Sequence, residues 1–273
     1  MQGELSQIIS LTSYGNGFFN NEHLIENYFP NNTTFQFCNS VDFRDFKKRS
    51  FSSKFDETIF AKNPLEWFRN LKKQGCQKLR LYYEGSTNAA SDPEYNTVGF
   101  VGGGGTWLIE SIFDNHSSYW HKRWQVTNQN ADDRKIWSVD YGRTLEKFPI
   151  TNQQLDIVSI TSQLKDILIQ LVEFCHQQNL KGWAETFGKA LHIFSSQEPN
   201  KDYYHYDLIA LKNYPVSSQQ LLFAVGKSWV FGGMGWWNDM SFENEAINES
   251  YLKLSQQLYE TLVKGIVAVT NSF

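Results

Sequence analysis

The spacing of apolar residues changes near Pro149, and no other feature of the chain constrains its fold as strongly. Before Pro149, short segments such as residues 77–84 alternate apolar and polar side chains, a pattern typical of half-buried strands. After it, apolar residues recur every three or four positions, as in residues 164–175, which indicates amphipathic helices. Strands in one half and helices in the other are typical of the α+β class.

The first half is expected to form an antiparallel sheet with flanking helices. Its strand-like segments are joined by short links, whereas parallel neighbours need crossovers of about a dozen residues or more. Residues 6–12 are β-branched and precede a glycine-rich turn at residues 14–17, so they also predict a strand. Asn63 and Pro64 predict the start of a helix. The other expected strands cover residues 77–84, 98–101, 106–112, 119–126 and 135–141.

The second half is expected to be mostly helical and to pack against the sheet. Neither a repeat of fixed period nor a linker rich in proline or serine separates the two halves. We therefore expect an α+β part at residues 1–150 and a helical part at residues 151–273, joined in one compact unit. Apolar stripes predict four helices, which begin near residues 155, 183, 217 and 248.

The sequence predicts a soluble protein of the cytoplasm. The longest aliphatic run, residues 266–269, is far shorter than the roughly 20 residues that span a bilayer, so no membrane association is expected. Residues 1–18 lack the cationic start and apolar stretch of a secretory signal. Three widely spaced cysteines are an odd number, which favours reduced thiols.

Charge is distributed unevenly and bears on the kind of partner. Residues 1–150 are neutral overall, whereas residues 151–273 carry 8 basic and 12 acidic groups. Neither half has the basic excess of a nucleic-acid binder, so that class is not expected. The acidic second half fits a protein partner, by analogy with an acidic inhibitor that neutralises a toxin.

Two glycine-rich loops are the candidate binding segments. Residues 231–239 combine three glycines with Trp236, Trp237, Asn238 and Asp239, and adjacent tryptophans cannot both point into one core from regular structure. The alternative is a tight interhelical turn whose aromatic rings seal the joint between the halves.

The other loop, residues 99–107, has four consecutive glycines and ends at Trp107. It lacks the glycine spacing of a dinucleotide-binding turn and the lysine of a phosphate-binding loop, so no cofactor is expected. A hairpin or a bulge is the structural alternative for this loop.

Candidate catalytic groups are few. His205 and Asp207 would share one face of a strand, and Glu84 and Glu110 lie near strand ends, so these four could act as acid, base or metal ligand. However, the chain contains no His-Glu-x-x-His, no Cys-x-x-Cys and no Gly-x-Ser-x-Gly, and no metal site is assigned.

These observations favour a non-catalytic intracellular binding or interaction protein. It would use a groove rich in glycine and tryptophan between its halves, with Trp107, Trp236, Trp237, Asn238 and Asp239 contacting a protein partner or a small ligand. The alternative is an enzyme that acts on a small molecule, with or without a metal ion. It would use Glu84, Glu110, His205 or Asp207 as acid, base or metal ligand. An enzyme should bring at least two of these four groups into one pocket.

Overall fold

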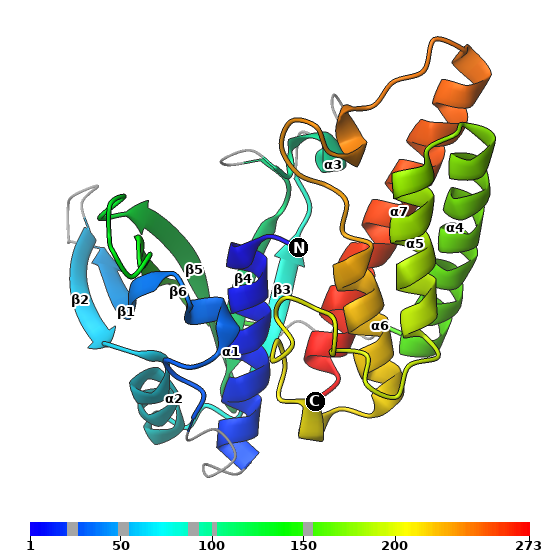
Figure 1. Cartoon of the computed structure of the whole chain (residues 1–273). Coiled ribbons are helices and arrows are strands. Elements are labelled where there is room, and N and C mark those ends of the chain that lie inside the picture. Colours follow the sequence, from blue (N-terminus) through cyan, green and yellow to red (C-terminus); the bar gives the residue numbers. More distant parts are fainter. Residues whose placement is uncertain (21–26, 49–54, 87–92, 100–102, 150–154) are drawn as a thin grey trace.

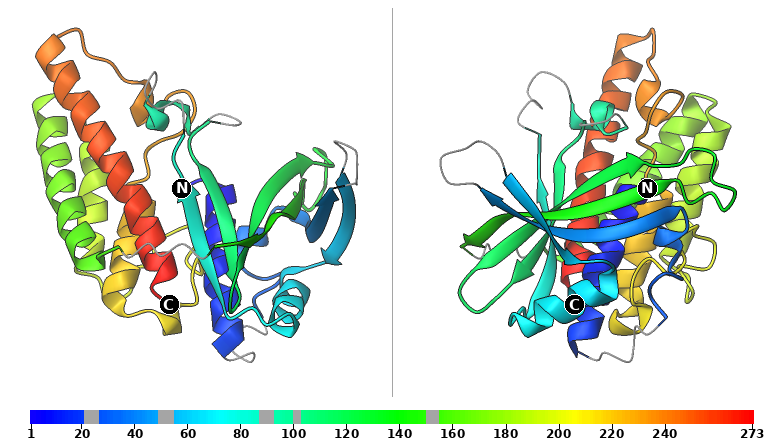
Figure 2. Two further views of the ribbon diagram at one scale, coloured as in Figure 1. Left: turned by 180° about the vertical axis from the view of Figure 1, so that it is seen from behind. Right: turned by 90° about the vertical axis from the view of Figure 1, so that its left-hand side faces the viewer.

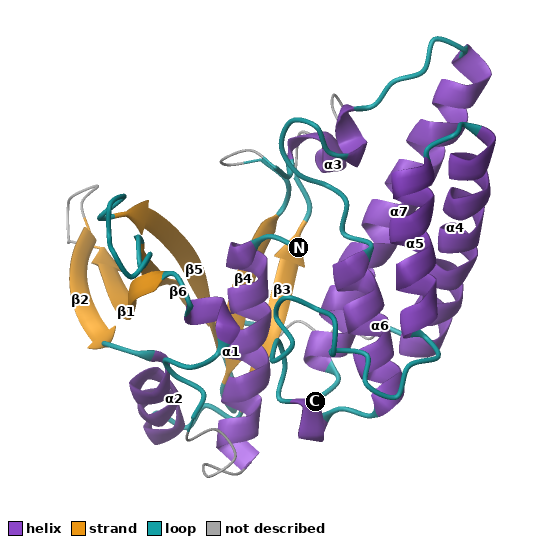
Figure 3. Cartoon of the chain, in the orientation of Figure 1, coloured by secondary structure: helices purple, strands orange, loops and turns teal. Residues whose placement is uncertain are grey.

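The chain folds into a sheet part and a helical part that lie side by side (Figure 1). The computed structural model describes residues 1–20, 27–48, 55–86, 93–99, 103–149 and 155–273. Figure 3 shows the strands gathered in one region and most of the long helices in the other. The predicted α+β class is confirmed.

Six strands form one mixed sheet in the order β2-β1-β6-β5-β4-β3. Neighbours run antiparallel except β1 and β6, which are parallel with Val41 opposite Val139. The antiparallel pairs agree with the prediction, but β6 returns beside β1 only after four intervening strands, so link length does not govern that pair. The strands are β1 (Cys38–Lys48), β2 (Phe55–Ala61), β3 (Lys78–Glu84), β4 (Thr106–Ile112), β5 (Ser117–Val126) and β6 (Trp137–Phe148).

The strand predicted over residues 6–12 is wrong, because this segment belongs to helix α1 (Gly3–Asn20). The helix is buried on nearly all sides, so its sequence lacks the apolar stripe by which a half-buried helix is recognised. Its polar side chains find partners inside: Gln7, for example, donates to the Thr34 carbonyl at 3.1 Å. Gly15, read as part of a turn, lies where a Cβ would be 2.3 Å from Leu79 Cδ1.

The helices predicted in the second half are confirmed, and α4 to α7 lie side by side (Figures 1 and 2). Asparagine caps fix two helix starts, since Asn63 accepts from the Glu66 N–H and Asn244 accepts from the Ile247 N–H. Among the described residues, no helix is both long and apolar enough to cross a bilayer. The helices are α2 (Pro64–Lys73), α3 (Glu94–Thr97), α4 (Ile157–Gln177), α5 (Lys181–Ile193), α6 (Val216–Lys227) and α7 (Glu245–Asn271), with short 3-10 turns η2 (Thr33–Phe35), η3 (Leu211–Asn213) and η4 (Trp237–Asp239).

Two predicted features fall partly or wholly outside the described residues. In the strand expected over residues 98–101, Val98 and Gly99 form a turn, and residues 100–102 lie outside the description. The boundary predicted between residues 150 and 151 falls within residues 150–154, which also lie outside it.

Strand β3, at the edge of the sheet, joins the two parts through two asparagine side chains. Asn16 of α1 accepts from the Leu79 N–H at 2.7 Å and donates to the Leu79 carbonyl at 2.9 Å. Asn271 of α7 does the same for Leu81, at 2.7 and 2.9 Å. Each amide therefore replaces a neighbouring strand, and the pairing fixes α1 and α7 against the same edge.

We predict that Asn271→Ala lowers the free energy of unfolding by about 1–3 kcal/mol, because it removes two hydrogen bonds and leaves the Leu81 backbone unpaired. Urea unfolding of the two proteins measures the difference. Ser272→Ala is the control, since the Ser272 hydroxyl donates to the Val269 carbonyl of its own turn and does not bond to β3. Equal losses in the two variants would contradict this role of Asn271.

Candidate functional site

The two glycine-rich loops meet at the joint between the sheet part and the helical part. A Cβ on Gly99 would lie 2.1 Å from the Gly232 carbonyl carbon and 2.5 Å from the Gly233 nitrogen. Only glycine allows this approach of one backbone to another. Figure 1 shows the segment before α7, coloured orange, beside α3. The glycine-rich sequences identified both loops as candidates, but no sequence pattern predicted that the two loops touch.

The loop of residues 231–239 is held in shape by its own side chains. Asn238 accepts from the Gly232 N–H at 3.0 Å and donates to the Gly232 carbonyl at 3.1 Å. The Asp239 carboxylate accepts from the N–H of Gly235, whose φ is +84°. The side chains of Asn238 and Asp239 therefore stabilise the backbone conformation of the loop through hydrogen bonds.

Trp236 and Trp237 point in different directions, as their adjacency predicts. Trp236 is 47% exposed and its ring covers Gly232. Trp237 is fully buried, and its indole N–H donates to Ser255 at 2.8 Å. The Trp237 ring packs among Phe174, Trp183, Phe187 and Tyr251. Trp237 thus belongs to the core of the helical part, and of these two adjacent tryptophans only Trp236 reaches the surface.

A cavity of about 610 Å³ lies beside the loop that ends at Trp107. We call it the tryptophan groove, because four tryptophans from different parts of the chain line it. Trp124 and Trp137 are half-buried, and their rings meet edge to face with centroids 5.7 Å apart. The lining comprises Gln2, Glu4, Leu5, Val98, Gly99, Gly103, Gly104, Gly105, Thr106, Trp107, His121, Lys122, Trp124, Trp137 and Trp229.

Two indole groups of the tryptophan groove have unused hydrogen-bonding capacity. The N–H groups of Trp124 and Trp229 are buried and have no acceptor among the residues that the structure describes. A buried donor without an acceptor costs about 1–3 kcal/mol. Both residues line the groove, but the nitrogen atoms themselves have almost no accessible surface.

The end of the tryptophan groove beside α1 is polar. Lys122 forms an ion pair with Glu4 at 2.9 Å, and Gln2 donates to the Val98 carbonyl at 2.6 Å. Partial desolvation and then Lys122 lower the pKa of His121, so this imidazole is neutral near pH 7. The groove therefore combines aromatic walls with a polar end of balanced charge.

Sequence analysis found Trp107 but missed the other three tryptophans of the groove. Trp124 and Trp137 look like ordinary strand residues, and Trp229 follows the last helical turn of α6. Their shared cavity depends on how β5, β6 and the end of α6 meet, and no local pattern encodes that meeting.

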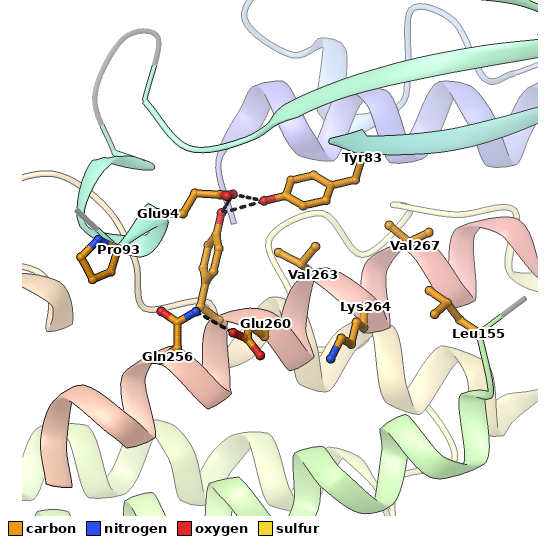
Figure 4. Close-up of a pocket in the computed structure, with 10 residues that line it drawn as sticks. Tyr83, Pro93, Glu94, Leu155, Gln256, Glu260, Val263, Lys264 and Val267 are labelled. Atoms are coloured by element: carbon orange, nitrogen blue, oxygen red, sulfur yellow. Dashed lines mark hydrogen bonds between the residues drawn. The ribbon is translucent and has the colours of Figure 1, made fainter. Parts of the chain in front are cut away.

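A second pocket, of about 430 Å³, lies between β3, α3 and α7 (Figure 4). The Glu94 carboxylate accepts from the hydroxyl groups of Tyr83 and Tyr259, the latter at 2.8 Å, and from the Ser86 N–H at 2.9 Å. Burial, and then Glu94, raise the pKa of Tyr259, so its hydroxyl stays protonated and donates. These bonds tie α3 and β3 to α7.

The candidate catalytic groups lie in different surroundings. Glu110 is fully buried and pairs with Arg80 at 2.6 Å, and its other oxygen accepts from Tyr119 at 3.2 Å. Glu84 is exposed at the end of β3. His205 and Asp207, in contrast, share one partner, Thr33.

The Thr33 hydroxyl donates to the Asp207 carboxylate, which also accepts from the Thr33 N–H at 2.9 Å. His205 Nδ1 lies 2.9 Å from the Thr33 hydroxyl oxygen. Because the only proton of that hydroxyl is donated to Asp207, its oxygen accepts here and the ring nitrogen carries the proton. Burial lowers the pKa of His205 to about 4, although Asp207 opposes this change. The cluster fastens η2 to the loop before η3, and within the described residues no group of three or more His, Cys, Asp or Glu side chains could hold a metal ion.

Comparison of the chain with protein-family models, curated proteins and solved structures finds no significant match.

We predict that Gly99→Ala lowers the free energy of unfolding by about 1–3 kcal/mol, because the new methyl group overlaps the backbone at Gly232. Thermal or urea unfolding measures the loss. Gly233→Ala is the matched control, since a Cβ at Gly233 meets no atom within 4 Å. The close contact of the loops would be refuted by two variants of equal stability.

We predict that His205 makes the protein less stable in acid. The unfolded chain protonates this imidazole near pH 6.5 and the folded protein only near pH 4, so stability is lost as the pH falls through this interval. His205→Asn should flatten the pH dependence of the unfolding free energy there, by up to about 3 kcal/mol at its acid end. His192→Asn is the control, because His192 is exposed. If His205→Asn leaves the pH dependence of the unfolding free energy unchanged, the lowered pKa of His205 is contradicted.

Proposed function

We propose that the protein is a non-catalytic binding protein that holds a small ligand in the tryptophan groove. The observation that carries this proposal is one cavity of about 610 Å³ lined by four tryptophans, two of which, Trp124 and Trp229, have a buried indole N–H without an acceptor among the described residues. Buried polar groups in native proteins are nearly always paired, and those left over call for an explanation.

The groove favours a ring-shaped ligand with a flat apolar face and oxygen acceptors at its edge. Tryptophan faces stack on such rings, and the N–H groups at their edges donate to oxygen. Saccharides and planar heterocycles both have this chemistry. The pair of Glu4 and Lys122 leaves the charge balanced, so a neutral ligand fits better than an ion.

The arrangement of candidate catalytic groups also favours binding over catalysis. Glu110 is neutralised by Arg80, and Asp207 is engaged by Thr33. Neither belongs to the lining of the tryptophan groove. A small-molecule enzyme that uses Glu84, Glu110, His205 or Asp207 would need these groups to converge in a pocket. His205 and Asp207 meet at Thr33, but none of the four residues lines the tryptophan groove or the pocket at Glu94.

We also propose that the protein works in the cytoplasm. Its three cysteines, Cys38, Cys76 and Cys175, are buried free thiols. Burial raises the pKa of Cys38 to about 11 and that of the other two to about 12, so all three resist oxidation. Unpaired thiols of this kind suit a reducing compartment.

We predict that a ligand of this class shifts the indole N–H signals of Trp124 and Trp229 in nitrogen-labelled protein. The chain has 9 tryptophans, so the signals are few enough to assign by substitution. A panel of saccharides and a panel of planar heterocycles form the two arms of the titration. Trp67 is the internal control, because its buried N–H also lacks an acceptor in the described structure but lies outside the groove.

Trp124→Ala should weaken the binding by about tenfold or more, since stacking on one ring contributes about 1–3 kcal/mol. Trp236→Ala should leave it unchanged, because Trp236 is not part of the groove. If neither panel moves the Trp124 and Trp229 signals, or if Trp67 moves equally, the groove is not a ligand site of this kind.

A further inference from the structure

We propose that the segment from Met234 to Glu249 is a docking surface for a basic, apolar segment of a partner protein. We call it the acidic loop, and it comprises the exposed side chains Met234, Trp236, Asp239, Glu243, Glu245 and Glu249. This interaction is separate from ligand binding in the tryptophan groove, because none of these residues lines that cavity.

The acidic loop presents two large apolar side chains to solvent. Met234 is 90% exposed and Trp236 is 47% exposed. Tryptophan is among the residues that dominate binding energies at protein interfaces. Methionine adds a flexible contact that adapts to the shape of a partner.

The backbone beneath these two side chains is fixed before any partner arrives. Asn238 closes the loop through two hydrogen bonds to Gly232, and the Asp239 N–H donates to the Trp236 carbonyl at 3.0 Å. The Trp236 ring itself lies on Gly232. A contact surface that is already ordered loses less conformational entropy on binding.

Charge identifies the kind of partner. Residues 228–252 contain four carboxylates and no lysine or arginine, so they account for the same net charge, −4, as the whole chain. All four carboxylates are exposed, and none forms an ion pair within the part of the chain that the structure describes. The four carboxylates lie in the same stretch of chain as these two apolar side chains, and their charge complements a segment that alternates lysine or arginine with apolar residues.

The same charge argues against two other occupants. Membrane surfaces inside cells carry anionic lipids, which repel four carboxylates, so Met234 and Trp236 are not a membrane anchor. The acidic loop of a second copy would be repelled in the same way. A basic protein segment is therefore the occupant that the exposed residues fit.

The test uses the full chain and a short synthetic peptide in which lysine and arginine alternate with leucine. Its addition should shift the indole N–H signal of Trp236, and the affinity should fall as salt is added, because charge attraction contributes. A peptide with glutamate in place of each basic residue, and one with serine in place of each leucine, should bind about tenfold more weakly or worse.

Variants of the chain separate this proposal from its alternatives. Trp236→Ala should weaken peptide binding by about tenfold or more. The combined change Glu243→Gln, Glu245→Gln and Glu249→Gln, which leaves only Asp239 charged among the four carboxylates, should reduce its salt dependence. Tyr204→Ala, which removes an aromatic side chain that is 60% exposed elsewhere, should have no effect.

Trp124→Ala should also leave peptide binding unchanged, so failure here is distinguishable from failure of the groove. The proposal is overturned if the basic peptide does not bind, if the acidic peptide binds equally well, or if Trp236→Ala binds like the parent. Binding of the chain to vesicles of anionic lipid, or self-association that Trp236→Ala abolishes, would also overturn it.

Discussion

The open edge of strand β3 is the constraint on which the arrangement of the two parts depends. An edge strand exposes backbone groups that must be paired or covered. Here two asparagine side chains, Asn16 from α1 and Asn271 from α7, pair with the backbone of Leu79 and Leu81. Because helices, and not another strand, complete the edge, the helical part is held directly against the sheet.

The binding features follow from this joint. Once α7 lies along β3, the loop that leads into it crosses to α3, and the backbones at Gly99 and Gly232 come into contact. The tryptophan groove lies beside this contact and receives Trp229 from the helical part and Trp107 from the sheet part. Glu94, held by Tyr83 and Tyr259, closes the same joint on its other side. The joint therefore holds the two parts together, and it is also where tryptophan side chains line a cavity that could bind a ligand.

The two proposed surfaces use tryptophan in different ways. In the groove, Trp124 and Trp229 contribute walls to a cavity lined by four tryptophans, which suits a small ligand with a flat ring. In the acidic loop, Trp236 contributes an exposed ring on a fixed backbone, which suits a protein segment. Trp237, its neighbour, contributes stability alone, because the fold encloses its ring and Ser255 satisfies its N–H. One residue type thus has three roles, and the surroundings decide which.

Apolar spacing by itself determined the α+β class, the strands from β3 to β6 and the helices of the second half, because the apolar residues of these segments are spaced as in strands or helices. It failed for α1, whose burial on nearly all sides removes any stripe, and for the parallel pairing of β1 with β6. The glycine-rich sequences, and not apolar spacing, indicated Trp107 and Trp236 as residues of unusual loops. Tertiary structure alone decided that Glu110 and His205 lie apart, that the two glycine loops touch, and that Trp124, Trp137 and Trp229 share a cavity. Such proximity results from long-range packing between segments far apart in the chain, and local periodicity carries no record of it.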